Sequence, residues 1–246
     1  MSVILALLFG LIALIYASVG FGGGSSYTAL LSLSGIEPRL IPIISLCCNI
    51  VVVTGGTFRF WRAGLLEWKA VLPLLVVSAP LAFLGGLTPL EETTFLAILG
   101  CTLLLSAFAL ILPQDRLPET KVPKPVLLAL SGAVGLLAGL SGIGGGIFMA
   151  PALHLIHWAE EKRIAAFASL YILVNSITGL AGQLIKHGPQ SFVEPALTYW
   201  PLLLAVLIGG QIGTHIGIQL IPPKWLRRIT ALLVGYAAIR LLMQAY

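Results

Sequence analysis

The chain is built from long apolar runs separated by short polar segments. Eight runs stand out, at residues 3–34, 40–57, 70–88, 94–112, 125–157, 164–185, 197–220 and 228–245. A helix needs about 20 apolar residues to cross a bilayer, and six of these runs have roughly that length. The pattern predicts an all-α integral membrane protein with six full transmembrane helices.

The two longest runs, 3–34 and 125–157, are each interrupted by glycines. Residues 20–24 read Gly-Phe-Gly-Gly-Gly, and residues 142–146 read Gly-Ile-Gly-Gly-Gly. Glycine costs about 1 kcal/mol relative to alanine in a helix interior, so such a tract ends a helix. We therefore expect each of these runs to form a helical hairpin broken at its glycines.

The two glycine tracts belong to a longer internal similarity. Other residues recur in the same order in both halves: Asn49 and Asn175, Pro73 and Pro201, and Gly85 and Gly213. The sequence predicts a first repeat at 1–112, a cytoplasmic linker at 113–124 and a second repeat at 125–246. Each repeat would hold one hairpin and three transmembrane helices.

The Lys and Arg residues bear on the orientation of the repeats, because cytoplasmic loops are enriched in them. If runs 3–34 and 125–157 each cross once, eight basic residues lie on one side and six on the other. If both runs are re-entrant, the split becomes eleven to three. The eleven are Arg59, Arg62, Lys69, Arg116, Lys121, Lys124, Lys162, Arg163, Lys224, Arg227 and Arg228; the three are Arg39, Lys186 and Arg240. This asymmetry favours two inverted repeats with re-entrant hairpins and both termini outside.

Composition narrows the class of function. Hydrophobic residues make up 58% of the chain and charged residues 9%, and the mean hydropathy is +1.03; a soluble domain carries about 25% charged residues. The basic residues lie mostly in loops, which gives no nucleic-acid patch. No Ser-His-Asp, HExxH or Cys/His group is visible, so we predict no enzyme, no cofactor and no metal.

The broken helices predict an anion site. A new helix starts after each glycine tract, and its free N–H groups and positive dipole end attract anions. The primary candidates are Gly22, Gly23, Gly24, Ser25, Asn49, Gly144, Gly145, Gly146, Asn175 and Thr178. The alternative is that the glycines only permit close helix packing and the amides only bond between helices.

Several other side chains are secondary candidates: Cys48, Gln183, Gln211 and His215. For the two glutamines a role in inter-helix hydrogen bonding is favoured, and for His215 a packed, hydrogen-bonded position. The favoured interpretation of the cysteines is that they are small packing residues. Arg59 and Arg62 read as anchors at the membrane surface rather than as guides for an anion.

Two halves that each open with such a broken segment resemble the sulfite exporter TauE/SafE family, also called the TSUP permeases. The most specific matches are residues 17–25 and 138–147. The resemblance covers essentially the whole chain. It implies transport of sulfite, sulfoacetate or related sulfur anions across the bacterial inner membrane. Only this resemblance indicates a sulfur compound, because composition and spacing indicate no more than an anion.

Taken together, these features predict a multi-pass secondary transporter that exports a small sulfur oxyanion by alternating access. Its partners would be the small anionic substrate and the lipid bilayer, with the protein a monomer or a homodimer. An anion channel of the same architecture is the rival, because broken half-helices also build channels.

Overall fold

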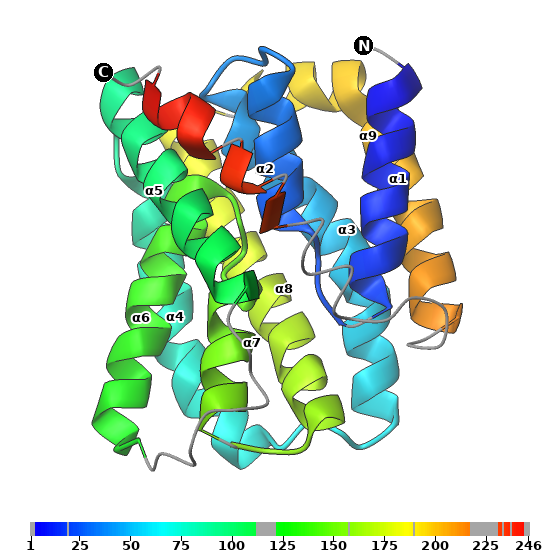
Figure 1. The fold of residues 1–246 in the computed structure, drawn as a ribbon, viewed down its shortest axis with the longest axis vertical. Coiled ribbons are helices and arrows are strands. Elements are labelled where there is room, and N and C mark those ends of the chain that lie inside the picture. The colour runs from blue at the N-terminus through cyan, green and yellow to red at the C-terminus, as the bar shows by residue number, and fades with distance from the viewer. Residues whose placement is uncertain are drawn as a thin grey trace.

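The computed structural model describes residues 3–18, 20–111, 122–156, 158–188, 190–216, 231–232, 234–236 and 238–243. Within these residues the fold is helical throughout, without a strand (Figure 1). The helices are α1 (Val3–Ala17), α2 (Gly24–Leu33), α3 (Leu40–Arg62), α4 (Trp68–Leu87), α5 (Glu92–Ile111), α6 (Lys124–Ser141), α7 (Gly146–Leu155), α8 (Glu161–His187) and α9 (Gln190–Ile216). A further apolar helical stretch covers Val234–Met243.

Five of the described helices are long and apolar enough to cross a membrane, which confirms the predicted all-α membrane class. They are Leu40–Arg62, Trp68–Leu87, Lys124–Ser141, Lys162–His187 and Leu197–His215. Four of them coincide with predicted spans. The fifth, Lys124–Ser141, is the first arm of the second predicted hairpin, so that arm alone has the length of a span. The predicted span at 94–112 is α5, whose described apolar part is shorter.

Several helices extend beyond the apolar runs that predicted them. α3 continues to Arg62, α8 already begins at Glu161, and α9 begins at Gln190, ahead of the run at 197–220. Polar and charged residues at a helix end reach the headgroup region, so backbone hydrogen bonding extends beyond the apolar stretch. The predicted linker at 113–124 lies outside the described residues except for 122–124, and the end of the run at 197–220 lies outside them too. Of the predicted last span at 228–245, residues 231–232, 234–236 and 238–243 are described.

Each glycine-broken run forms two helices that double back on one another. Figure 1 shows α1 running inward from the end of the molecule marked N, and α2 returning toward that same end. The pair α6 and α7 opens at the opposite end. The arms are unequal, with 15 and 10 residues in the first pair and 18 and 10 in the second. How these pairs sit in a membrane stays a prediction.

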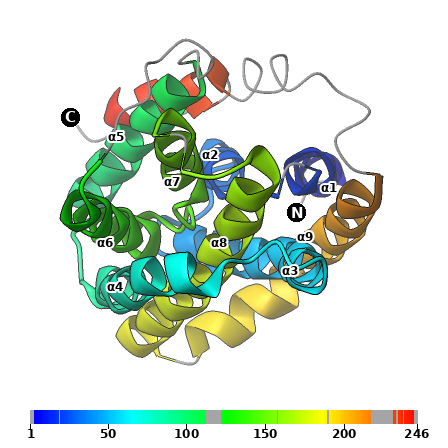
Figure 2. The same cartoon turned by 90° about the horizontal axis from the view of Figure 1, so that it is seen from below.

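The helices pack in a pattern that is the same in both halves. α3 packs against α8 in the interior, α4 packs against α6 and α8, and α9 packs against α1 and α3. Figure 2 shows the pair α4 and α6 on one flank and the pair α1 and α9 on the other. The two sets of contacts are equivalent if α4 corresponds to α9, α6 to α1 and α8 to α3, as in the predicted repeats.

Matching glycines bring the flanking helices unusually close. A methyl group on Gly85 of α4 would overlap the carbonyl oxygen of Leu136 in α6, and one on Gly213 of α9 would overlap that of Leu14 in α1. Leu14 and Leu136 each stand six residues before the first glycine of their break. Small residues allow this backbone approach where apolar lipid gives helices little reason to associate otherwise.

Candidate functional site at the two glycine tips

Each break depends on glycines in the left-handed backbone region. We call residues 20–24 the first glycine tip and residues 142–146 the second. The chain leaves the first arm through Gly20 (φ 84°) or Gly142 (φ 78°). It enters the second arm through Gly23 (φ 93°) or Gly145 (φ 79°). A residue with a β-carbon is strained at such φ values, so the four positions require glycine.

The first turns after the breaks are also alike. The carbonyl of Gly23 accepts hydrogen bonds from the N–H groups of Ser26 and Tyr27, both at 3.0 Å. The carbonyl of Gly145 accepts from Phe148 and Met149, both at 3.1 Å. Earlier N–H groups of a helix have no acceptor within it. Each tip therefore carries the partial positive charge that suits an anion.

Asn49 of α3 lies between the two tips and joins them. Its Nδ2 donates to the carbonyl oxygens of Ile143 at 3.3 Å and Gly142 at 3.5 Å in the second tip. A methyl group on Gly22 would lie 2.5 Å from its Oδ1, and one on Gly24 would lie 2.6 Å from its Nδ2. The glycines of the first tip thus make room for the amide, and the two tips meet at this side chain.

Ser45, one helical turn before Asn49, reinforces the same contact. Its hydroxyl donates to the carbonyl of Gly142 at 2.8 Å and reaches that of Gly24 at 3.3 Å, one in each tip. Sequence reasoning missed Ser45. The signal was its spacing, because residues four apart lie on the same face of a helix.

Asn175 of α8 is fully buried but has no hydrogen-bond partner at either Nδ2 or Oδ1. One turn earlier on the same helix, the hydroxyl of Tyr171 donates to the carbonyl of Ser131 at 2.7 Å. The Tyr171 ring in turn lies beneath the second tip, since a methyl group on Gly145 would be 3.1 Å from it. Asn175 therefore lies one helical turn along α8 from a side chain that packs against the second tip.

Ser176 brings a further unpaired group to the second tip. Its hydroxyl is buried and has no partner, and a methyl group on Gly144 would lie 3.1 Å from its Oγ and 2.9 Å from Asn49 Nδ2. The Oδ1 of Asn49 is likewise unpaired. A buried polar group without a partner costs about 1–3 kcal/mol, so these groups are candidates to bind a ligand or an ordered water.

The remaining primary candidates are placed less directly. Ser25 is buried in the first turn of α2. Thr178 is partly exposed and its hydroxyl bonds the backbone of its own helix, at the carbonyls of Val174 (3.0 Å) and Asn175 (3.4 Å). The structure therefore brings Ser25 to a tip and leaves Thr178 bonded within its own helix.

The secondary candidates make other contacts. Gln183 donates to the carbonyl of Gly139 at 3.0 Å, with its Oε1 unpaired. Gln211 accepts from Arg59 Nη2 at 3.0 Å. Cys48 is buried in an apolar cluster. The two glutamines thus link helices, as the favoured interpretation expects.

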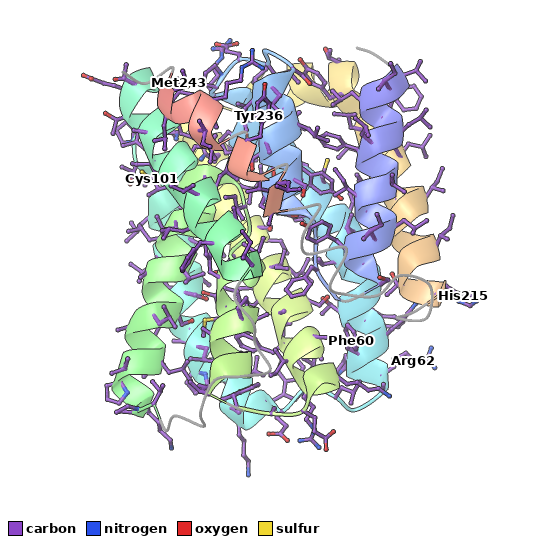
Figure 3. All side chains as sticks on the ribbon, in the orientation of Figure 1. Phe60, Arg62, Cys101, His215, Tyr236 and Met243 are labelled. Atoms are coloured by element: carbon purple, nitrogen blue, oxygen red, sulfur yellow. The ribbon has the colours of Figure 1, made fainter. Side chains whose placement is uncertain are left out.

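His215 is a correction. It was expected to be packed and hydrogen-bonded, but it is exposed, and Figure 3 shows it pointing outward at the edge of the molecule. The cause is helix geometry. Gly213 turns toward α1, and two residues later the helix has rotated by about 200°, which directs His215 away from the core.

The described residues contain no group of three His, Cys, Asp or Glu side chains that could hold a metal ion. The chemistry available at the tips is therefore that of backbone N–H groups, amides and hydroxyls. Such a set suits the recognition of an oxyanion through hydrogen bonds.

Comparison with known proteins gives matches over nearly the full length. The sequence profile of the family described as Sulfite exporter TauE/SafE matches residues 5–241. Probable membrane transporter protein y4hK of Sinorhizobium fredii is 33% identical over 245 residues, which are 97% of this chain and 97% of that protein. Probable membrane transporter protein YunE of Bacillus subtilis is 24% identical over 248 residues and 88% of each chain. No solved structure matches.

Proposed function

The chain belongs to the sulfite exporter TauE/SafE family, and on this basis we propose that it exports a small sulfur oxyanion, sulfite or an organosulfonate such as sulfoacetate. Family membership confirms the resemblance carried by the glycine motifs. It also confirms that this multi-pass membrane protein is a transporter and not an enzyme. Substrate, direction and mechanism are the content of the proposal.

The observation that carries the proposal is the meeting of two helix starts at Asn49, beside unpaired polar groups. The Nδ2 of Asn175 and the Oγ of Ser176 are buried donors without acceptors. A sulfonate or sulfite group presents three oxygen atoms, each able to accept hydrogen bonds. The N–H groups of the two tips, together with these side chains, would supply the donors without any full positive charge.

The hydrogen bonds also suggest how the site opens. Asn49 and Ser45 now hold the carbonyl oxygens of the second tip. For an anion to enter between the tips, these donors must leave the carbonyls and turn to the substrate oxygens. We therefore propose that Asn49 holds the two tips together through these hydrogen bonds before substrate binds. It releases the second tip when substrate oxygens replace the carbonyl oxygens as its acceptors.

Alternating access would follow from the two tightly packed flanks. The pairs α4 with α6 and α1 with α9 are held at close range by glycine contacts, so each is expected to move as a unit around α3 and α8. The paired halves and the charge asymmetry support inverted repeats, as in other transporters with broken helices near the midplane. Cysteine labelling at both termini would test this, and a cytoplasmic C-terminus would contradict it.

Flux into liposomes is the deciding experiment. Purified protein should carry radiolabelled sulfite or sulfoacetate with saturation kinetics, and Asn175→Ala should reduce that flux at least tenfold. Thr54→Ala is the matched control, because this exposed hydroxyl bonds only the carbonyl of Ile50 in its own helix. Flux and binding that are unchanged in Asn175→Ala would show that the amide has no role. Single-channel currents that do not saturate would favour the anion channel instead.

A further inference from the structure

Arg59 occupies a different environment from Arg62, the other basic residue in the last turn of α3. It lies in the last turn of α3, and its Nη2 donates to Gln211 Oε1 of α9 at 3.0 Å. Gly55, one turn earlier, makes room for this glutamine, since a methyl group there would lie 2.6 Å from Gln211 Nε2. The hydrogen bond to the Gln211 amide thus holds the Arg59 guanidinium between α3 and α9.

The other terminal nitrogen of Arg59, Nη1, is buried and has no hydrogen-bond partner. The ion pairs found among the described residues, Arg39 with Glu37 and Arg163 with Glu67, use other charges. An arginine side chain cannot shed its proton to relieve the cost of burial. Although Arg59 as a whole is only half-buried, its guanidinium therefore offers one buried, unpaired donor to an oxyanion.

Arg62 shows what an ordinary surface anchor looks like three residues further on. Its side chain is exposed and lies over the ring of Phe58, with 5.8 Å between Cζ and the ring centroid. Figure 3 shows it pointing outward at the edge of the molecule. Arg62 thus has the exposure expected of a surface anchor, whereas helix rotation directs Arg59 toward α9.

We infer that Arg59 and Gln211 form a second oxyanion-binding subsite, at the predicted cytoplasmic end of α3. It lies ten residues beyond Asn49, about 15 Å along the helix axis. A guanidinium offers two parallel donors that match a pair of sulfonate or phosphate oxygens. The subsite would hold the anion on its way to the tips; this role rests on the proposed function, although binding itself does not.

Two sources could supply the oxyanion: a soluble sulfonate, or the phosphate of a lipid headgroup. Chemical labelling separates them. Phenylglyoxal modifies accessible arginines. The reconstituted protein is labelled intact and then digested, and tandem mass spectrometry of its peptides reports modification at Arg59 and Arg62 separately. Sulfoacetate is the probe, because sulfite would itself add to the carbonyl of the reagent. The protein is placed in phosphatidylcholine vesicles, with and without phosphatidylglycerol.

Sulfoacetate is expected to slow modification of Arg59 at least fivefold in pure phosphatidylcholine, with Arg62 unchanged as the internal control. The protection should persist in Asn175→Ala, which separates this subsite from the tips and keeps the test valid even if no flux is found. Equal protection of both arginines, protection only by phosphatidylglycerol, or an Arg59 that never reacts would each overturn the inference.

Transport kinetics give a second readout. Arg59→Gln should raise the KM for sulfoacetate presented at that end about tenfold, the loss of one charge-assisted hydrogen bond, and leave the maximal rate within about twofold. Arg59→Lys should restore part of the affinity, and Arg62→Gln should behave as the wild type. A KM that is unchanged in Arg59→Gln would contradict a role in capture.

Discussion

Asn49 and Asn175 recur in the same order in the two predicted repeats, yet their amides are used differently. Asn49 donates to carbonyl oxygens of the second tip, whereas neither polar atom of Asn175 has a partner. The difference extends to the neighbours. Phe9 stacks on Tyr27 beside the first tip, with ring centroids 4.7 Å apart, where the second half instead has Ser131 bonded to Tyr171. The backbone breaks of the two tips are alike, whereas their surroundings differ.

This contrast suggests a division of labour. The first half supplies the side chains that hold the tips together, Ser45 and Asn49. The second half supplies buried donors that are free for a ligand, Asn175 and Ser176. Variants at matched positions should therefore have unequal effects, and the following predictions run from the largest difference to the smallest.

The glycines that start α2 and α7 should differ most. A methyl group at Gly24 would overlap the backbone carbonyl of Ile143, which cannot move away alone. At Gly146 it would overlap only the Ile172 side chain, which can change rotamer. We expect Gly24→Ala to destabilise by about 3 kcal/mol and Gly146→Ala by about 1 kcal/mol.

Thermal unfolding in detergent would measure this difference. Gly235→Ala is the control, because the nearest atom to its new methyl group would be 3.7 Å away. An equal decrease of the unfolding temperature in Gly24→Ala and Gly146→Ala would show that the two tips are packed alike. That result would contradict the structure.

The two asparagines should separate stability from transport. Asn49→Leu removes the donor to Ile143 and leaves that carbonyl unpaired, at a cost of about 2 kcal/mol. Asn175→Leu removes two unpaired buried atoms at similar volume, so stability should stay level or rise, while flux is lost. Unfolding midpoints and liposome flux on the same preparations test both halves of the statement. A destabilised Asn175→Leu would mean that this amide has a structural partner.

The two buried tyrosines give the smallest expected difference. Tyr171→Phe removes the hydrogen bond to Ser131 and should cost about 1 kcal/mol. Tyr27→Phe removes a hydroxyl that has no partner and keeps the ring stacked on Phe9, so its unfolding midpoint should not fall. The same melting experiment compares them, and a larger loss in Tyr27→Phe would reverse the proposed contrast.

Much of this arrangement could be predicted from local signals. The glycine tracts predicted both breaks, and the apolar runs at 40–57, 70–88 and 164–185 predicted α3, α4 and α8. Asn49 and Asn175 were predicted as site residues from their recurrence, and that role stays a prediction. The end of each helix was less predictable, because backbone hydrogen bonding continues past the last apolar residue, as at Arg62 of α3.

The orientation of single side chains was not predictable in the same way. Each step along a helix turns a side chain by about 100°, so a shift in packing decides whether a residue meets a neighbour or faces outward. Arg59 and Arg62 differ for this reason, as do Gly213 and His215. Ser45 escaped notice because serine is common in packed helices and its partners lie 97 and 21 residues away in the chain.

The sequence by itself determined where helices run and where they must break. Both depend on properties of a few consecutive residues: apolarity over the thickness of a bilayer, and the left-handed backbone that glycine alone adopts without strain. Only the tertiary structure decided that the two tips meet at Asn49, that the amide of Asn175 is left unpaired, and that Arg59 turns inward. These features depend on which helices lie side by side, and such contacts join residues far apart in the chain.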